Sequence, residues 1–331
     1  MRVVEVEAPV RSTTGSRPDV LLEPGDGGRA GACTGPRVIV GYDGSAASDV
    51  ALDVATEEAF TRGLPLSVVC ALEPPLGGPV HLSSQRGAAE AALADAANRA
   101  AEVLGAGGVT DELVVGSPSA RLVGACRPGD LLVVGTHGHR PVARMLLGSV
   151  SAAAVAHAPC PVLVARASRS APGAPVVVGV DGSPSSLAAL AAAAEIADTG
   201  DVPLRAVLAL PPFVDALGFV TAASEAEQEQ ARALLRDAVD VVLAAHQNLP
   251  VEEELVQAHP VDALLRASRH AGVAVVGSRG RGGVRSMLMG SVSRELVHRA
   301  PCSVLVVRGS RGSQPASEPA LRSRGELLRP A

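Results

Sequence analysis

Residues 131–151 read LLVVGTHGHRPVARMLLGSVS, and they contain the spacing from which the fold can be predicted. A run of apolar residues ends at Gly135, a second glycine follows at Gly138, and a Gly-Ser pair stands at Gly148 and Ser149. Apolar runs of this length are typical of buried strands, and glycine lets a loop approach a ligand or another part of the backbone. The stretch therefore predicts a strand, a glycine loop and a helix start, in that order.

The same pattern occurs a second time, in residues 273–293, VAVVGSRGRGGVRSMLMGSVS. An upstream segment is repeated as well, with VGYDGSAAS containing Asp43 and VGVDGSPSS containing Asp181. Asp181 follows Asp43 by 138 residues, whereas Gly277 follows Gly135 by 142, so the second copy has about four extra residues. The chain is an internal duplication.

The composition narrows the class of protein. The chain has 331 residues, of which 47% are hydrophobic, but only one Tyr, three Phe and no Trp, so its cores must be built from Ala, Val and Leu. All 29 basic residues are Arg, which excludes a Walker-A lysine and a Schiff-base lysine. The net charge of -5 gives no basic footprint for nucleic acid, so no nucleic-acid partner is expected.

The cysteines and the apolar segments indicate the compartment. The five cysteines are odd in number and form no Cys-x-x-Cys pair, which argues against a disulfide framework or a zinc site; they are Cys33, Cys70, Cys126, Cys160 and Cys302. No stretch approaches 18 uninterrupted apolar residues, and the start MRVVEVEAPVRS has acidic residues where a signal peptide has its apolar core. We expect a cytoplasmic protein without a membrane partner.

Composition also suggests where the domains begin and end. Residues 1–35 and 309–331 are rich in Gly, Pro, Ser and Arg without periodicity, and we expect them to be disordered tails. Residues 167–174 are expected to be a linker. The two domains are then expected to span 36–166 and 175–308.

Within each copy, short apolar runs alternate with Ala-rich stretches. In the first copy, strands are expected from Arg37, Pro65, Asp111, Asp130 and Cys160. Helices are expected over residues 45–62 and 85–104, from Pro118 and from Ser149. Continuous apolar runs between helices are typical of strands buried on both faces of a parallel sheet. The predicted fold class is α/β, with two tandem five-stranded, Rossmann-like parallel-sheet domains.

In such sheets a ligand binds beyond the carboxyl ends of the strands, where the strand order reverses. Asp43 and Asp181 follow the first strand of each copy, and Gly135 and Gly277 end the fourth. The Gly-Ser pair then opens the last helix, whose free N–H groups and dipole favour an anion. The pattern predicts a phosphate site in each copy, although the two aspartates could instead be N-caps, a role for which the serines two residues later are better placed.

These paired signatures resemble the universal stress protein family in its tandem-domain, ATP-binding form, whose domains have an adenine nucleotide alpha hydrolase-like fold. The resemblance implies bound ATP, commonly with Mg²⁺ on its phosphates, and pairing of the two copies within a chain or between chains of a homodimer. It implies that Asp43 and Asp181 hold the adenosine moiety. It further implies that the ribose and phosphate path is lined by Gly135, Gly138, Gly277 and Gly280, and that the phosphates are received by Gly148, Ser149, Val150, Ser151, Gly290, Ser291, Val292 and Ser293.

The first loop departs from the usual family pattern. It has His139, Arg140 and Pro141 where the family more often has Arg-Gly-Gly, as the second loop has from Arg281. Because two flexible positions are lost, the first site is expected to be stiffer or weaker than the second.

The expected function is that of an ATP-binding stress-response regulator, in which nucleotide occupancy controls conformation or association with a regulatory partner. No paired carboxylate, metal-ligand cluster or activated nucleophile stands in these segments, so we expect no catalytic residues and little or no hydrolysis. Two alternatives remain. One is a slow ATPase or a related ATP-using enzyme, and the other is a scaffold that no longer binds nucleotide.

Overall fold

The computed structural model describes residues 35–73, 79–138, 147–167, 171–214, 220–281 and 289–309. The expected tails, apart from their innermost residues, lie outside these ranges. The elements of the first half are, in chain order, β1 (Val38–Gly41), α1 (Ala46–Arg62), β2 (Leu66–Leu72), α2 (Pro79–Leu104), β3 (Val109–Val115), α3 (Pro118–Ala125), β4 (Leu131–Gly135), α4 (Ser149–His157) and β5 (Val162–Ala165).

The second half repeats this order with two additions, a short strand pair and a 3-10 helix. Its elements are β6 (Val176–Gly179), α5 (Pro184–Thr199), β7 (Leu204–Ala209), β8 (Phe213–Val214), β9 (Val220–Thr221), α6 (Glu225–Leu243), β10 (Val251–Val256), α7 (Pro260–Ala267), the 3-10 helix η1 (Ser268–His270), β11 (Val273–Gly277), α8 (Ser291–Arg299) and β12 (Ser303–Val307). The short antiparallel pair β8–β9 was not predicted, because each strand has only two residues and leaves no periodic pattern.

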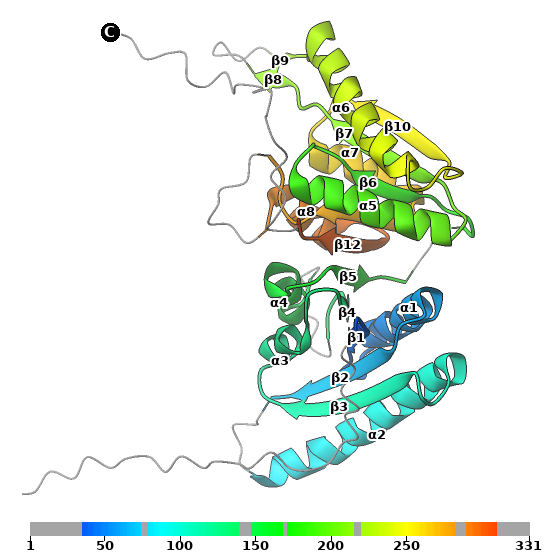
Figure 1. Ribbon diagram of the computed structural model, residues 1–331. Coiled ribbons are helices and arrows are strands. Elements are labelled where there is room, and N and C mark those ends of the chain that lie inside the picture. The colour runs from blue at the N-terminus through cyan, green and yellow to red at the C-terminus, as the bar shows by residue number, and fades with distance from the viewer. Residues whose placement is uncertain are drawn as a thin grey trace, which may run out of the picture. The chain divides into compact units, whose positions relative to one another are not determined.

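Within each half, the strands of the main sheet run parallel to one another, as predicted. Their order is β3-β2-β1-β4-β5 in the first half and β10-β7-β6-β11-β12 in the second (Figure 1). Val38 lies opposite Leu66 of β2 on one side and Leu131 of β4 on the other. The α/β fold class, with a Rossmann-like strand order in each half, is therefore confirmed.

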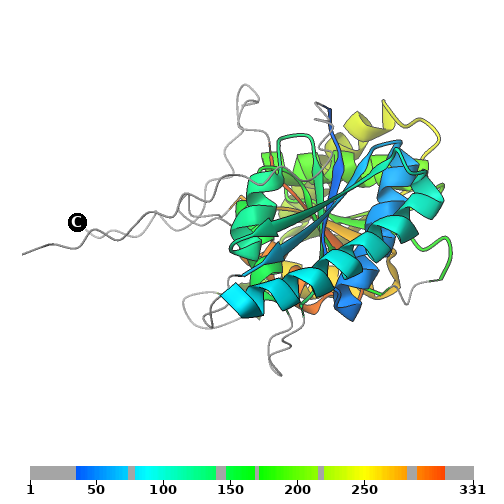
Figure 2. The same ribbon diagram turned by 90° about the horizontal axis from the view of Figure 1, so that it is seen from below.

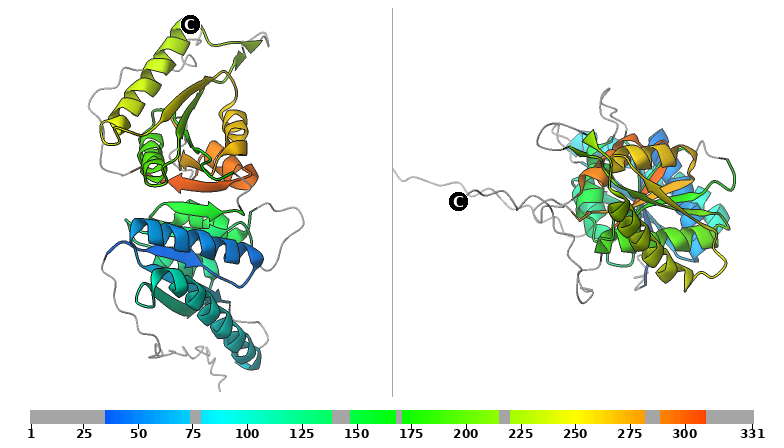
Figure 3. Two further views of the ribbon diagram at one scale, coloured as in Figure 1. Left: turned by 90° about the vertical axis from the view of Figure 1, so that its right-hand side faces the viewer. Right: turned by 90° about the horizontal axis from the view of Figure 1, so that it is seen from above.

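Helices cover both faces of the strands. In the first half, Val38 and Val40 pack into a core shared with α1 and α2, while Ile39 packs into a second core with α3 and α4. Figure 2 shows α2 running obliquely across the strands of this half. The second half has the same layers, with α6 lying beside β10 (Figure 3). Ala, Val and Leu dominate both cores, as the shortage of aromatic residues predicts.

Strands β5 and β12 pair antiparallel, so the two halves share one ten-stranded sheet. Two arginines at the ends of these strands make reciprocal contacts. The Arg166 guanidinium donates to the carbonyl of Val297 in the last turn of α8 at 2.6 Å, and the Arg308 guanidinium donates to the carbonyls of Val155 and Ala156 in α4. A cation at a helix C-terminus is favourable because it opposes the negative end of the helix dipole.

The outer strands β3 and β10 carry acidic residues that limit further pairing. Asp111 and Glu112 of β3 and Glu252 and Glu253 of β10 are all exposed. Charged side chains on an edge strand disfavour the addition of another strand. The acidic run in β10 is thus a solvated sheet edge.

The single tyrosine provides a direct probe of the first core. Tyr42 is buried, and its hydroxyl donates to Asp49 at 3.0 Å, while Arg99 pairs with Asp49 at 2.8 Å. Burial, followed by the hydrogen bond to Asp49, raises the pKa of Tyr42 to about 12.

The ultraviolet absorbance of the phenolate is therefore expected to appear with a midpoint near pH 12 in the native protein and near pH 10 in denaturant. Because the folded state favours the protonated phenol, this stabilisation is present below about pH 10 and is lost, by roughly 2 to 3 kcal/mol, as the pH rises to about 12. Tyr42→Phe should remove that part of the pH dependence of unfolding. A native midpoint near 10 would contradict the buried placement.

Candidate functional site

The candidate site lies where the strand order reverses. β1 and β4 are neighbours, β2 and β3 lie beyond β1, and β5 lies beyond β4. Asp43 follows β1 and Gly135 ends β4, so both stand at the carboxyl edge of this pair. Asp181 and Gly277 have the same places after β6 and in β11. In open α/β sheets this position is a ligand-binding crevice.

Each aspartate meets the second glycine of the neighbouring loop. A Cβ atom at Gly138 would overlap a carboxylate oxygen of Asp43, and one at Gly280 would overlap the corresponding oxygen of Asp181. That oxygen of Asp181 also accepts a hydrogen bond from the backbone N–H of Arg281 at 3.1 Å. The loop backbone therefore lies directly against the carboxylate, and a side chain at either position would displace it.

The N-cap alternative for the aspartates is wrong. Ser45 is the N-cap of α1 and Ser183 is the N-cap of α5, and their hydroxyls accept backbone N–H bonds from three residues further on, at 3.3 and 3.2 Å. The aspartates instead brace the turn before each helix. Asp43 accepts from the N–H of Ser45 at 3.0 Å, and Asp181 accepts from the N–H of Ser183 at 2.9 Å.

The first glycine of each loop has a packing role. A Cβ at Gly135 would lie 2.5 Å from the carbonyl oxygen of Ala47 in α1. A Cβ at Gly277 would lie 2.6 Å from the carbonyl carbon of Ser185 in α5. These glycines let the strand end pack closely against the first turn of a helix, with or without a ligand.

The Gly-Ser pairs begin the last helices. Gly148 and Gly290 are the N-caps of α4 and α8, and neither helix has a side-chain cap. The N–H of Gly148 donates to the carbonyl of Thr136 at 2.7 Å, and that of Gly290 donates to Ser278 at 2.8 Å. The first N–H groups of a helix have no acceptor within the helix, so they can bind an anion.

The loop brings each helix start close to its aspartate. Thr136 bonds to Gly148, and two residues later Gly138 touches Asp43. Two backbone steps span at most about 7 Å, so one ligand can contact both places. Ser278, Gly280 and Asp181 repeat this arrangement in the second half.

The residues that follow the N-cap differ in exposure. Ser149 and Ser291 are exposed at the first helical position. Val150 and Val292 are partly buried and pack against the core shared by α3, α4, α7 and α8. At these two positions, therefore, the backbone N–H rather than the side chain is the group suited to a phosphate.

Ser151 and Ser293 are buried and hold the loop in place. The Ser151 hydroxyl donates to the carbonyl of Gly135 at 2.6 Å, and the Ser293 hydroxyl donates to the carbonyl of Ser278 at 3.2 Å. Their hydroxyl protons are thus used within the protein. The family resemblance implied that both serines help to receive the phosphates, whereas in the structure their hydroxyls bond to backbone carbonyls of the loop.

The second half contains additional contacts that the sequence did not suggest. The hydroxyls of Ser183 and Ser185 both donate to the carbonyl of Arg279, the former at 3.3 Å. The guanidinium of Arg281 lies against Gly182, where a Cβ would be 2.8 Å from its Nη2. The only sequence signal was Ser185 itself, because the first half has an alanine at the equivalent position.

The first-half loop is described only in part. The hydroxyl of Thr136 and Nδ1 of His137 form a hydrogen bond of 2.8 Å. His139, Arg140 and Pro141 lie outside the described residues, as do the two glycines after Arg281. The expectation that the first site is stiffer or weaker therefore stays a prediction.

Two further properties concern only the described part of the chain. It contains no group of three or more His, Cys, Asp or Glu side chains that could hold a metal ion. None of its helices combines the length and apolar character needed to cross a membrane.

Comparison with known proteins gives a consistent picture. The universal stress protein family model matches residues 36–166 and 174–308. A universal stress protein of Mycobacterium tuberculosis is 35% identical over 287 residues, which cover 82% of this chain and 97% of the relative. The crystal structure of a universal stress protein from Archaeoglobus fulgidus is 19% identical, covers 82% of this chain and 98% of that chain, and has a TM-score of 0.63, which shows the shared fold. A solved universal stress protein in complex with cAMP is 31% identical and covers 42% of this chain and 100% of that chain, with a TM-score of 0.35. With a matching domain in each half and this similarity over most of its length, the chain belongs to the universal stress protein family.

Proposed function

We propose that each half of this chain binds an adenine nucleotide, ATP, and that the protein is a cytoplasmic stress-response regulator. Nucleotide occupancy controls its conformation or its association, either with a second copy or with a regulatory protein partner. The observation that carries this proposal is the contact between a strand-end carboxylate and a loop glycine at the point where the strand order reverses, made twice in one chain.

The residues present fit such a ligand. In the second half, the Asp181 carboxylate can accept hydrogen bonds from the adenosine moiety. Because Gly280 has no side chain, the loop backbone lies close to this carboxylate and to the proposed ligand. The start of α8 supplies N–H groups and the positive end of a helix dipole, which favours each phosphate charge by about 0.3 to 1 kcal/mol. Mg²⁺ would be held mainly by the phosphates and water, since it usually takes few protein ligands.

Little or no hydrolysis is part of the proposal. An enzyme needs a base or nucleophile held near the reacting phosphate. The buried Ser151 and Ser293 hydroxyls donate to backbone carbonyls, and the Asp181 carboxylate accepts two backbone N–H bonds. These groups brace the loop, which suits stable occupancy better than turnover.

The test is to purify the full chain, release its ligand, and identify the nucleotide by chromatography. Adenine nucleotide, or tight binding of added ATP by stripped protein, is the expected result, with phosphate release no faster than in a buffer control. A chain that neither carries nor binds ATP would contradict the binding proposal. Phosphate release above the control would overturn the regulatory interpretation in favour of a slow ATPase.

A further inference from the structure

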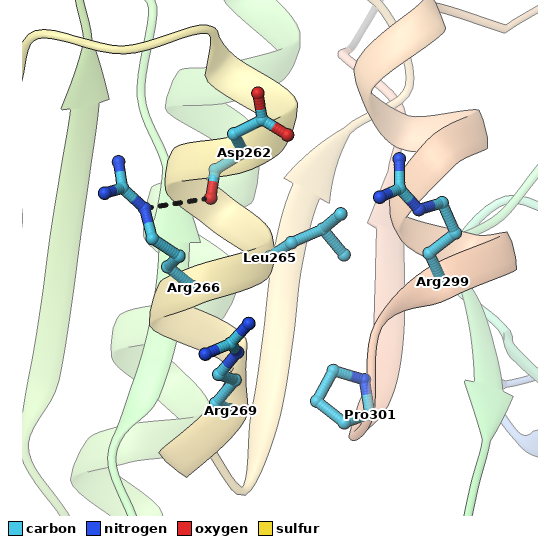
Figure 4. Close-up of a pocket in the computed structure, with 6 residues that line it drawn as sticks. All are labelled: Asp262, Leu265, Arg266, Arg269, Arg299 and Pro301. Carbon is cyan, nitrogen blue, oxygen red and sulfur yellow. Dashed lines mark hydrogen bonds between the residues drawn. The ribbon is translucent and has the colours of Figure 1, made fainter.

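A hollow of about 450 Å³ lies between α7 and α8 of the second half. Figure 4 shows Leu265 of α7 and Arg299 of α8 pointing toward each other across the gap, with Arg269 below them. The lining residues are Asp262, Leu265, Arg266, Arg269, Arg299 and Pro301. None of them belongs to the glycine loop or is one of the two strand-end aspartates, so this hollow is separate from the candidate nucleotide site.

The charge of the lining is positive. Three of its six residues are exposed arginines, and Asp262 is the only carboxylate among the six. Arg266 donates to the backbone carbonyl of Asp262 at 3.4 Å, a bond that leaves its charge in place. Arg299 pairs with Glu295 at 3.3 Å, but both side chains are about half exposed, and such a pair is weak and readily exchanged.

The first half supplies an internal comparison. Its equivalent positions lie 142 residues earlier and are occupied by Ala120, Val123, Gly124, Arg127, His157 and Pro159. The apolar residues Leu265 and Pro301 correspond to Val123 and Pro159, which are also apolar, but two of the three arginines are absent. The fold therefore does not require the arginine cluster, which belongs to the second half alone.

We propose that this hollow binds a small, multiply charged phosphate anion. Arg269 approaches it from η1, just after α7, and Arg299 approaches it from α8. Arg266 points away from α8 in Figure 4, and it becomes a third donor when it leaves its contact with the Asp262 carbonyl and turns toward the hollow. Guanidinium groups suit this ligand because each presents parallel N–H donors that match two phosphate oxygens. Leu265 and Pro301 provide the apolar wall, which shields the contacts from water on one side.

The test uses inorganic pyrophosphate as the probe and isothermal titration calorimetry on the full chain. Arg269→Gln combined with Arg299→Gln is expected to weaken pyrophosphate binding about tenfold or more. Each substitution removes a charged hydrogen bond that contributes to the free energy of binding. Arg127→Gln is the matched control, because Arg127 is the exposed first-half equivalent of Arg269. It should leave the affinity unchanged, and binding to the original chain should weaken as salt is raised.

Three results would overturn the proposal. The double variant could bind pyrophosphate as tightly as the original chain, or Arg127→Gln could weaken binding equally, which would indicate nonspecific attraction. The third is loss of pyrophosphate binding by Gly138→Ala combined with Gly280→Ala, which would place the probe in the nucleotide site. All three side chains are exposed, and a thermal melt of each variant checks that it folds.

Discussion

Replacing Gly277 with alanine is expected to lower the free energy of unfolding by about 2 to 3 kcal/mol, as overpacking of a tight contact typically does. The new Cβ would lie 2.6 Å from the carbonyl carbon of Ser185 and 2.8 Å from the backbone nitrogen of Ser186. These atoms belong to the first turn of α5, so no side-chain rotation can relieve the overlap. Either β11 or the helix must shift, and urea denaturation measures the cost.

Gly124→Ala is the matched control. Gly124 lies inside α3, and a Cβ there would meet no atom within 4 Å. Because alanine favours a helix more than glycine does, this variant should be as stable as the original chain or more stable by up to about 1 kcal/mol. Equal destabilisation by both substitutions would show that the close approach of β11 to α5 is not what requires glycine at position 277.

Replacing Gly280 with alanine is expected to have the opposite profile, with a large loss of ATP affinity at the second site and little loss of stability. Its Cβ would overlap the Asp181 carboxylate, which is the movable end of a side chain. The carboxylate can turn away at low cost to the fold, but it then leaves the position from which we propose that it holds the nucleotide. Loss of such a charged hydrogen bond corresponds to roughly tenfold to a hundredfold in affinity.

Both readouts are needed for this variant. Urea denaturation of Gly280→Ala should give a free energy of unfolding within about 1 kcal/mol of the original chain, and ATP titration should give the weakened second site. A variant that unfolds easily would mean that Gly280 serves packing, as Gly277 does. One that folds well and binds ATP normally would remove Asp181 from the proposed site.

Much of the fold could be predicted because the strands are continuous apolar runs. Val38–Gly41 and Leu131–Gly135 stand out from their surroundings, and Ser45 marks the start of α1 as an N-cap serine should. Because the chain is duplicated, each of these patterns occurs twice, which strengthens the prediction. The positions of Asp43 after the first strand and of the glycine loop after the fourth correctly predicted that they lie together. Parallel strands place their carboxyl ends at one edge of the sheet, and Gly138 lies beside Asp43 there.

Other features could not be predicted, for physical reasons. The hydroxyl of Ser151 can donate to a ligand or to a carbonyl, and only the path of the loop decides that it bonds to Gly135. The pairing of β5 with β12 depends on which sheet edges are left uncovered, which no local pattern records. The arginines between α7 and α8 come from segments about 30 residues apart, so the sequence separates what the helix packing brings together.

The two proposed nucleotide sites are tested most directly by equilibrium dialysis of ATP against the full chain and against Gly138→Ala combined with Gly280→Ala. The original chain should bind one ATP in each half, and the folded double variant should show no saturable binding at the same ATP concentrations. If the double variant bound ATP with the original stoichiometry and affinity, the strand-end aspartates and the loop glycines would not form the nucleotide site.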